Sequence, residues 1–218
     1  MKYELLNRIL TSCVLLPILI FCLNYSGIFF IIFLTLIYLL CFIEIIKNIK
    51  SIPFNFVSNI VLIFALFSFY DLRGGTNYSL IIIYWILTAT FLSDIGGYVF
   101  GRMFKGKKLT SISPSKTYSG SLGSVALSLS SLLVLNYLQF FLFNKYLINF
   151  YQIKYIILTI LISVVCQLGD LYVSFWKRKI NIKNISNILP GHGGVLDRID
   201  GLIFVLIFCF IIKHIGLI

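Results

Sequence analysis

The chain has 218 residues, of which 60% are hydrophobic and only 11% are charged, and its mean hydropathy is +1.02. Soluble domains contain roughly 45–50% apolar residues, so this composition excludes a soluble enzyme and indicates a polytopic membrane protein. The formal net charge of +11 must then lie in the loops, where it can set the topology or attract anionic lipid or an anionic substrate.

Seven apolar runs are long enough to cross a bilayer, which takes about 17–25 residues. Because lipid leaves backbone groups no water to bond, these runs are expected to be helices. The first run follows Lys2 and Arg8 and lacks a small-residue cleavage site after it, so we expect it to be retained. In chain order, the expected spans are residues 9–23, 27–46, 54–70, 78–100, 118–143, 153–176 and 201–218.

Most of the 18 lysine and arginine residues lie in the N-terminal tail and in the loops after the second, fourth and sixth spans. The positive-inside rule places all of these on the cytoplasmic side. We therefore expect a cytoplasmic N-terminus and two large basic loops on the same face. Interleaved Gly and Ser in residues 118–143, and the Gly97–Gly101 pair, indicate closely packed helices.

Only seven acidic residues are present, so the position of each is informative. We expect Glu44 to lie at the membrane interface, and Asp71, in a short turn with Arg73, to be structural. Asp94 and Asp170 lie inside apolar segments, where a lone carboxylate costs roughly 2.5–3.5 kcal/mol to insert and by default marks function. The alternative for both is a buried packing group paired with a Ser or Arg.

The depths of these aspartates predict a common site. Asp94 and Asp170 lie about 12 Å and about 10 Å from the basic ends of their spans, at 1.5 Å per residue. Asp197 and Asp200 enter the last span from the same face. We expect the four to meet in one cavity open to the cytoplasm, surrounded by basic residues. Carboxylates for a metal and Lys or Arg for phosphate oxygens suit a nucleoside triphosphate with Mg²⁺.

Two polar segments flank this cavity. The segment PGHGGVLDRIDG (residues 190–201) has glycines that let backbone N–H groups approach a ligand, beside carboxylates suited to a metal that carries phosphate. Its alternative reading is a capped helix start, with Asp197 as the cap and Asp200 favoured by the helix N-terminus. The segment SPSKT (residues 113–117) reads either as an anion site or as a Ser-Pro turn with a helix cap.

These residues resemble the integral-membrane phosphatidate cytidylyltransferases (CDP-diacylglycerol synthases). The similarity extends over about residues 94–201, whereas the earlier spans match only in character and the chain is short for the family. Its long spaced motif consists of Ser174, Lys177-Arg178, Lys183, Pro190, His192-Gly193-Gly194, Asp197-Arg198 and Asp200. The upstream segments that match are Asp94-x-Gly96-x-Tyr98-x-x-Gly101, Ser113-Pro114-x-Lys116-Thr117 and Gly169-Asp170-Leu171.

The resemblance implies an all-α fold with membrane spans in residues 1–77, a catalytic membrane region in residues 78–218, and an active site at the cytoplasmic face. It implies transfer of CMP from CTP to phosphatidic acid, giving CDP-diacylglycerol and pyrophosphate for phospholipid biosynthesis, with Mg²⁺ and a second cation left open. The implied catalytic residues are Asp94, Asp170, Asp197 and Asp200, with Asp170 and Asp197 as metal ligands. The implied contacts to CTP are Lys177, Arg178, Lys183, His192, Arg198, Ser113, Lys116 and Thr117.

The expected partners are CTP, phosphatidic acid and the lipid bilayer of a bacterial inner membrane, without nucleic acid; a homodimer is left open. Three positions depart from the family pattern: Val173 and Asn184 replace acids, and Trp176 replaces an aliphatic residue. Two missing acids lower the metal-binding capacity. Alternatives are therefore a related CTP-dependent lipid transferase, or a catalytically weakened homologue with a lipid-binding or structural role. A transporter is disfavoured by the lack of internal repeats and mid-membrane acids.

Overall fold

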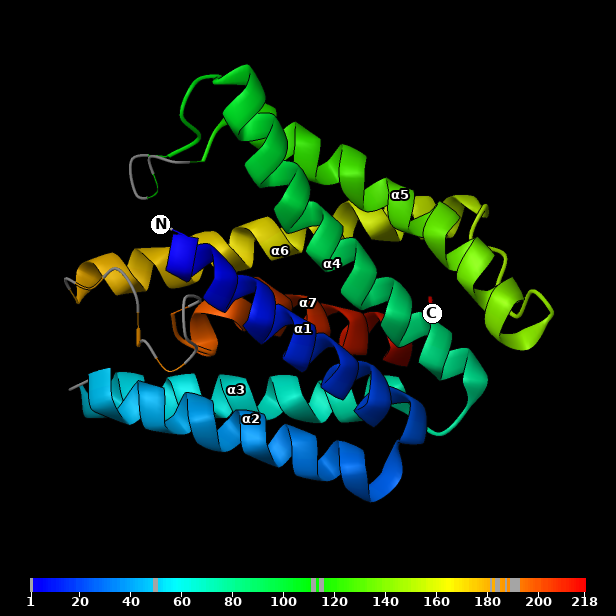
Figure 1. Ribbon diagram of the computed structural model, residues 1–218, viewed down its shortest axis with the longest axis horizontal. Helices are drawn as coiled ribbons and strands as arrows, with labels where there is room; N and C mark the ends of the chain where they lie inside the picture. The colour runs from blue at the N-terminus through cyan, green and yellow to red at the C-terminus, as the bar shows by residue number, and fades with distance from the viewer. Residues whose placement is uncertain are drawn as a thin grey trace.

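The computed structural model describes residues 2–48, 51–110, 113, 116–180, 182, 185–186, 188 and 193–218. Over these residues the secondary structure is helical apart from loops and an isolated bridge between Lys108 and Thr117. The helices, in chain order (Figure 1), are α1 (Lys2–Tyr25), α2 (Gly27–Asn48), α3 (Ile52–Arg73), α4 (Asn77–Phe104), α5 (Tyr118–Phe143), α6 (Ile153–Lys179) and α7 (Leu196–His214).

Helices α2 to α6 are long and apolar enough to cross a membrane. In α1 a shorter apolar stretch, Cys13–Tyr25, is described, and α7 carries charged residues in its first turns. Many large apolar side chains are exposed, such as those of Leu122 and Phe141, as expected for helices that face lipid. The protein is an all-α polytopic integral membrane protein, as predicted.

The last helix begins earlier than we expected from the sequence. It starts at Leu196 rather than at Gly201, so Asp197 and Asp200 belong to its first turns and not to a loop. Residues three apart on a helix lie on neighbouring positions of one face. Both carboxylates are therefore fixed by a regular backbone.

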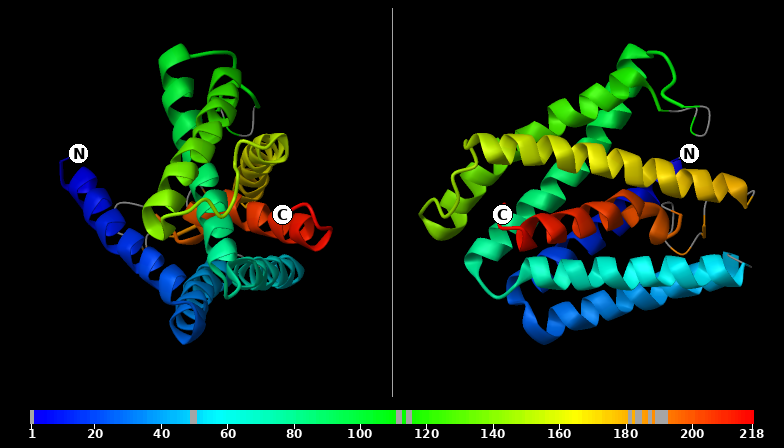
Figure 2. Two further views of the ribbon diagram at one scale, coloured as in Figure 1. Left: turned by 90° about the vertical axis from the view of Figure 1, so that its right-hand side faces the viewer. Right: turned by 180° about the vertical axis from the view of Figure 1, so that it is seen from behind.

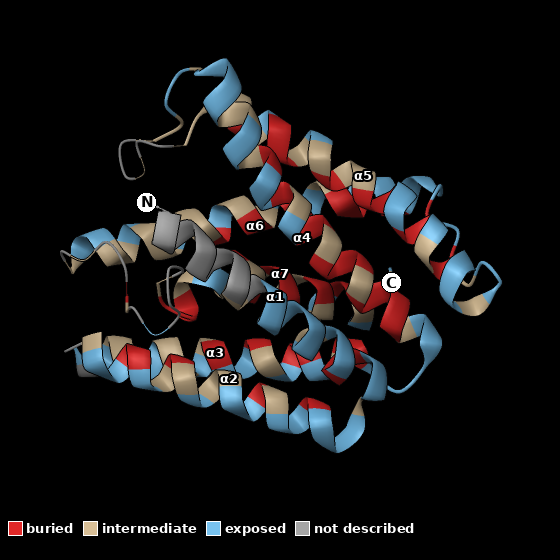
Figure 3. Cartoon of the chain, viewed as in Figure 1, coloured by how far each residue is buried: buried red, intermediate tan, exposed pale blue. Residues whose placement is uncertain are grey.

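Helix α7 is the centre of the arrangement, because it packs between α3 and α6 (Figures 1 and 2). Helix α2 lies along α3, and α4 forms a hairpin with α5 and crosses the other helices. Figure 3 shows that buried residues are concentrated along α4 and α7, whereas the outer faces of α2 and of the second half of α1 are exposed. The described parts of the α4–α5 and α6–α7 connections lie at the same end of the bundle as the end of α2 (Figure 1).

Close contact between α4 and α5 depends on small residues. A Cβ atom added at Gly96 would lie 2.4 Å from the carbonyl oxygen of Gly123, and one at Gly120 would lie 2.8 Å from that of Gly97. Hydroxyls join α4 to α6, since the hydroxyl oxygens of Ser93 and Ser163 lie 2.8 Å apart. The predicted glycine and serine packing face is confirmed, and it sets the position of Asp94, which directly follows Ser93.

Candidate active site

Carboxylates from three helices converge at the loop end of the bundle. Asp94 comes from α4, Asp170 from α6 and Asp200 from α7. Asp170 lies within electrostatic range of both Asp94 and Asp200. The thiol of Cys166, one turn before Asp170, lies 3.4 Å from Oδ1 of Asp94. The structure thus brings side chains that are far apart in the sequence to one end of the bundle.

A lysine from the α4–α5 loop neutralises Asp170. Lys116 forms an ion pair with Oδ2 of Asp170, and Ser174, one turn further along α6, donates to Oδ1 at 3.4 Å. Lys116 is held in place by a backbone pairing, in which Leu109 N–H donates to its carbonyl at 2.8 Å. Thr117 caps α5 by accepting from the Gly120 N–H at 3.1 Å. This part of the segment is therefore the helix cap that we considered as an alternative.

A second lysine joins the two aspartates of α7. The Nζ atom of Lys177, in the last turn of α6, lies 3.0 Å from Oδ1 of Asp197 and 3.4 Å from Oδ2 of Asp200. All three side chains are 12–13% exposed. Ion pairs this far from water are screened much less than surface pairs. One lysine shared by two carboxylates leaves a negative charge that further cations can balance.

The other oxygen of Asp197 organises the loop before α7. Its Oδ2 accepts from the backbone N–H of Ile185 at 2.9 Å and of Gly194 at 3.2 Å. Gly193 has φ +90°, a backbone conformation that residues other than glycine rarely adopt. Asp197 therefore holds the glycine-containing turn against the start of α7 while its Oδ1 faces Lys177.

Glu44 of α2 holds the same segment from the opposite side, which the sequence did not lead us to expect. Its side chain is fully buried within the protein, near the end of α2. The carboxylate accepts from the backbone N–H of Val195 at 2.8 Å and of Leu196 at 2.9 Å, and from the hydroxyl of Ser186. These amides begin α7, where a negative charge is favoured by the helix dipole.

The remaining predicted site residues differ in whether the structure places them near the carboxylates. Arg198 lies within electrostatic range of Asp94. Arg178 is exposed, and its guanidinium donates to the Ile182 carbonyl at 3.4 Å, away from the carboxylates. Ser113 forms a turn in which its carbonyl accepts from the Lys116 N–H at 3.0 Å. Lys183 and His192, together with Asn184, lie outside the described residues.

The donor set suits a hard divalent cation in its chemistry, because Mg²⁺ prefers carboxylate oxygens and retains several waters. Among the residues that the structure describes, no three His, Cys, Asp or Glu side chains are already arranged around one point. Asp170 lies within electrostatic range of Asp94 on one side and of Asp200 on the other. The assignment of Asp170 and Asp197 as metal ligands stays a prediction.

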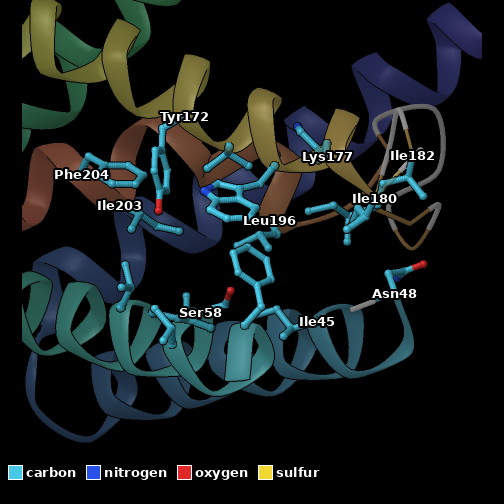
Figure 4. A pocket seen from close by; sticks show the side chains of 17 residues that line it. Ile45, Asn48, Ser58, Tyr172, Lys177, Ile180, Ile182, Leu196, Ile203 and Phe204 are labelled. Carbon is cyan, nitrogen blue, oxygen red and sulfur yellow. The ribbon is translucent and has the colours of Figure 1, made fainter. Parts of the chain in front are cut away.

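An apolar pocket of about 170 Å³ adjoins this cluster between α3, α6 and α7. Figure 4 shows Tyr172 and Phe204 at one end and Ile180 and Ile182 at the other, with Leu196 between them. Lys177 also lines the pocket. The same lysine therefore contacts the carboxylates and the edge of an apolar space.

Comparison with known proteins agrees with this geometry. The model of the cytidylyltransferase family matches residues 50–215. The chain belongs to this family. The match includes all of α3 to α7. It leaves out α1 and α2, and Glu44 belongs to α2.

Curated relatives named phosphatidate cytidylyltransferase match over shorter stretches. The protein from Rickettsia conorii is 38% identical over 140 residues, which are 63% of this chain and 59% of that protein. The one from Staphylococcus haemolyticus is 39% identical over 140 residues, 63% of this chain and 50% of that protein. The one from Rickettsia felis is 35% identical over 158 residues, 71% and 67% of the two chains. The chain thus spans only about half of some of its relatives.

Proposed function

We propose that this protein is a phosphatidate cytidylyltransferase, which transfers CMP from CTP to phosphatidic acid. The observation that carries the proposal is Lys177, which contacts two partly buried carboxylates and also lines an apolar pocket. A reaction between a nucleoside triphosphate and a lipid phosphate needs phosphate-binding groups at an apolar boundary. Family membership and the names of the relatives point to the same reaction.

In this reaction a phosphate oxygen of phosphatidic acid attacks the α-phosphorus of CTP. The bond between the α-phosphorus and the bridging oxygen breaks, and pyrophosphate leaves with the electron pair. Lys116 and Lys177, which form ion pairs with Asp170, Asp197 and Asp200, donate to the phosphate oxygens when CTP is bound. Arg198 adds a third cation near Asp94. These charges hold the reacting phosphates close together against their mutual repulsion.

The carboxylates of Asp94, Asp170 and Asp200, with Asp197, are the residues that would hold Mg²⁺, which offsets phosphate charge and stabilises pyrophosphate as the leaving group. Asp197 has a second task whatever its metal role, because its Oδ2 fixes the loop before α7. We propose that the loop end of the bundle faces the cytoplasm of a bacterial cell. The concentration of lysine and arginine in the connections at that end supports this orientation.

A catalytically weakened homologue is the second candidate. It is favoured by one observation, namely that Asp170 and Asp197 are both paired with lysines while Val173 stands where an acid was expected. Such a protein would bind lipid or nucleotide without turnover.

Purified protein with α-labelled CTP, phosphatidic acid and Mg²⁺ tests the first candidate. We expect lipid-linked label and an equal amount of pyrophosphate. Asp170→Asn removes a carboxylate between Asp94 and Asp200, so we expect at least a hundredfold lower rate, the size typical of one lost electrostatic group. Asp71→Asn is the matched control, because Asp71 pairs with Lys213 at the other end of the bundle, and it should keep the full rate.

A folded protein that forms no lipid-linked CMP would instead support the weakened homologue. A normal rate in Asp170→Asn would remove this carboxylate from the mechanism. If both single variants, Asp71→Asn and Asp170→Asn, lost activity, the two changes would act through folding.

A further inference from the structure

The apolar pocket between α3, α6 and α7 has a wall that the reaction chemistry does not explain. It is lined by Phe54, Val57 and Val61 of α3 and by Val173 and Trp176 of α6. Val173 and Trp176 are two of the three departures from the family pattern. Both departures described by the structure therefore line the same pocket, and they make its wall apolar.

Trp176 has an unused hydrogen-bond donor. Its indole Nε1 is buried and has no partner among the described residues, although the ring itself is well packed, with Phe54 at 4.4 Å between ring centroids. Buried indole N–H groups normally find an acceptor. An apolar ligand with a carbonyl oxygen would supply one after a small turn of the ring brings the N–H toward the pocket that Trp176 lines.

The size and position of the pocket select the kind of ligand. At about 170 Å³ it is smaller than the roughly 300 Å³ at which sites for whole small molecules begin, so it takes a segment of an apolar chain. Lys177, at its edge, is tied to Asp197 and Asp200. We take the ligand to be an apolar chain attached to a phosphate, because the proposed reaction brings a lipid phosphate to this cluster.

We propose that the α3–α6–α7 pocket binds the ester end of one acyl chain of a lipid whose head group is a phosphate monoester, such as phosphatidic acid. The ester carbonyl then accepts from Trp176 Nε1. The phosphate then lies beside Lys177, next to the site at which the nucleotide binds. This inference rests on the proposed function for the identity of the lipid. It adds that the pocket between α3, α6 and α7 positions this lipid. It also assigns Val173 and Trp176 as specificity-determining residues.

A binding experiment that needs no turnover tests the pocket. Phosphatidic acid with a diazirine near the carboxyl end of one acyl chain is irradiated with the purified protein, and the labelled peptides are identified by mass spectrometry. We expect labelling on α3 and α6 at the pocket. Val173→Phe fills the space and should remove the label, whereas Val164→Phe, the same change at an exposed position of the same helix, should keep it.

Kinetics give a second readout. Trp176→Phe keeps an aromatic ring but removes the N–H together with the five-membered ring of the indole, so we expect KM for phosphatidic acid to rise at least two- to tenfold, the range of one hydrogen bond. KM for CTP should stay unchanged. This variant also tests the pocket if Val173→Phe does not fold, which thermal unfolding in detergent would reveal.

Several results would overturn the inference. Labelling confined to other helices, equal effects on both KM values, or a label that survives in Val173→Phe would each contradict it. Diacylglycerol that competes as well as phosphatidic acid would exclude a phosphate-bearing ligand. Pocket labelling in a protein that transfers no CMP would uphold the lipid site and reject the proposed reaction, so the two proposals fail separately.

Discussion

Two carboxylates of different helices fix the segment before α7. Asp197 binds the backbone N–H groups of Ile185 and Gly194, and Glu44 binds those of Val195 and Leu196. A buried carboxylate is costly unless hydrogen bonds replace its hydration. Here the bonds come from amides that lack partners at a helix start. Glu44 therefore positions the first residues of α7, which lie beside the carboxylates of the candidate site.

Replacing Glu44 tests this positioning role. Glu44→Gln retains one oxygen but turns an NH₂ group toward backbone donors, so we expect a loss of about 1–3 kcal/mol of stability and at least tenfold lower CMP transfer. Glu44→Asp should recover part of both. Hydrogen exchange at the amides of Val195 and Leu196 is the direct measurement, and it should be faster in Glu44→Gln.

Unchanged exchange at those two amides would contradict the role, whatever the activity. Ser186→Ala is the milder companion change, because it removes only the hydroxyl donor to Glu44 and leaves both amide bonds in place.

The sequence located the aspartates of the site but not Glu44. Asp94 and Asp170 lie deep in apolar segments, and that depth was enough to mark them. Glu44 lies near the end of its helix, where a solvated interfacial side chain is the ordinary expectation. Its partners are backbone N–H groups distant in the chain, and backbone amides leave no signature in an amino-acid pattern.

At the level of elements, the hairpin of α4 and α5 depends on the absence of side chains at its contact. The two backbones approach so closely at Gly96 that a methyl group would meet the carbonyl oxygen of Gly123. Overpacking of this kind typically costs about 1–3 kcal/mol. Since Asp94 and Lys116 belong to this hairpin, its geometry also controls the site.

Gly96→Ala is therefore expected to lower Tm in detergent, with Gly75→Ala as the control. Gly75 lies in the α3–α4 turn, and a Cβ there would have no heavy atom within 4 Å. Equal Tm values for the two variants would show that the backbones can separate without loss. A lower Tm confined to Gly75→Ala would contradict the packing argument outright.

Helix boundaries show where prediction from composition stops. The span of residues 118–143 coincides with α5, because capping at Thr117 and the apolar run begin together. Helix α7 starts five residues before the expected Gly201. Its first turn is charged, and its amides are satisfied by Glu44 rather than by a local cap, so hydropathy places the start too late.

For the whole molecule, the connections that carry most of the lysine and arginine lie at one end (Figure 1). Trypsin added to sealed membrane vesicles tests the orientation of that end. In inside-out vesicles we expect cleavage at Lys105, Lys107 or Lys108. In right-side-out vesicles we expect these sites to be protected and Lys145, in the α5–α6 connection, to be cut. The reverse pattern of fragment masses would invert the proposed topology.

The family match begins at residue 50, but the amides at the start of α7 rely on an acid at position 44. A shortened protein limited to the matched region would keep every aspartate discussed above. It would still lose the carboxylate of Glu44, which accepts from the backbone N–H groups of Val195 and Leu196 at the start of α7. Chimeras that exchange the first helices between relatives face the same demand. A shortened protein that keeps these hydrogen bonds must therefore include the part of α2 that carries Glu44.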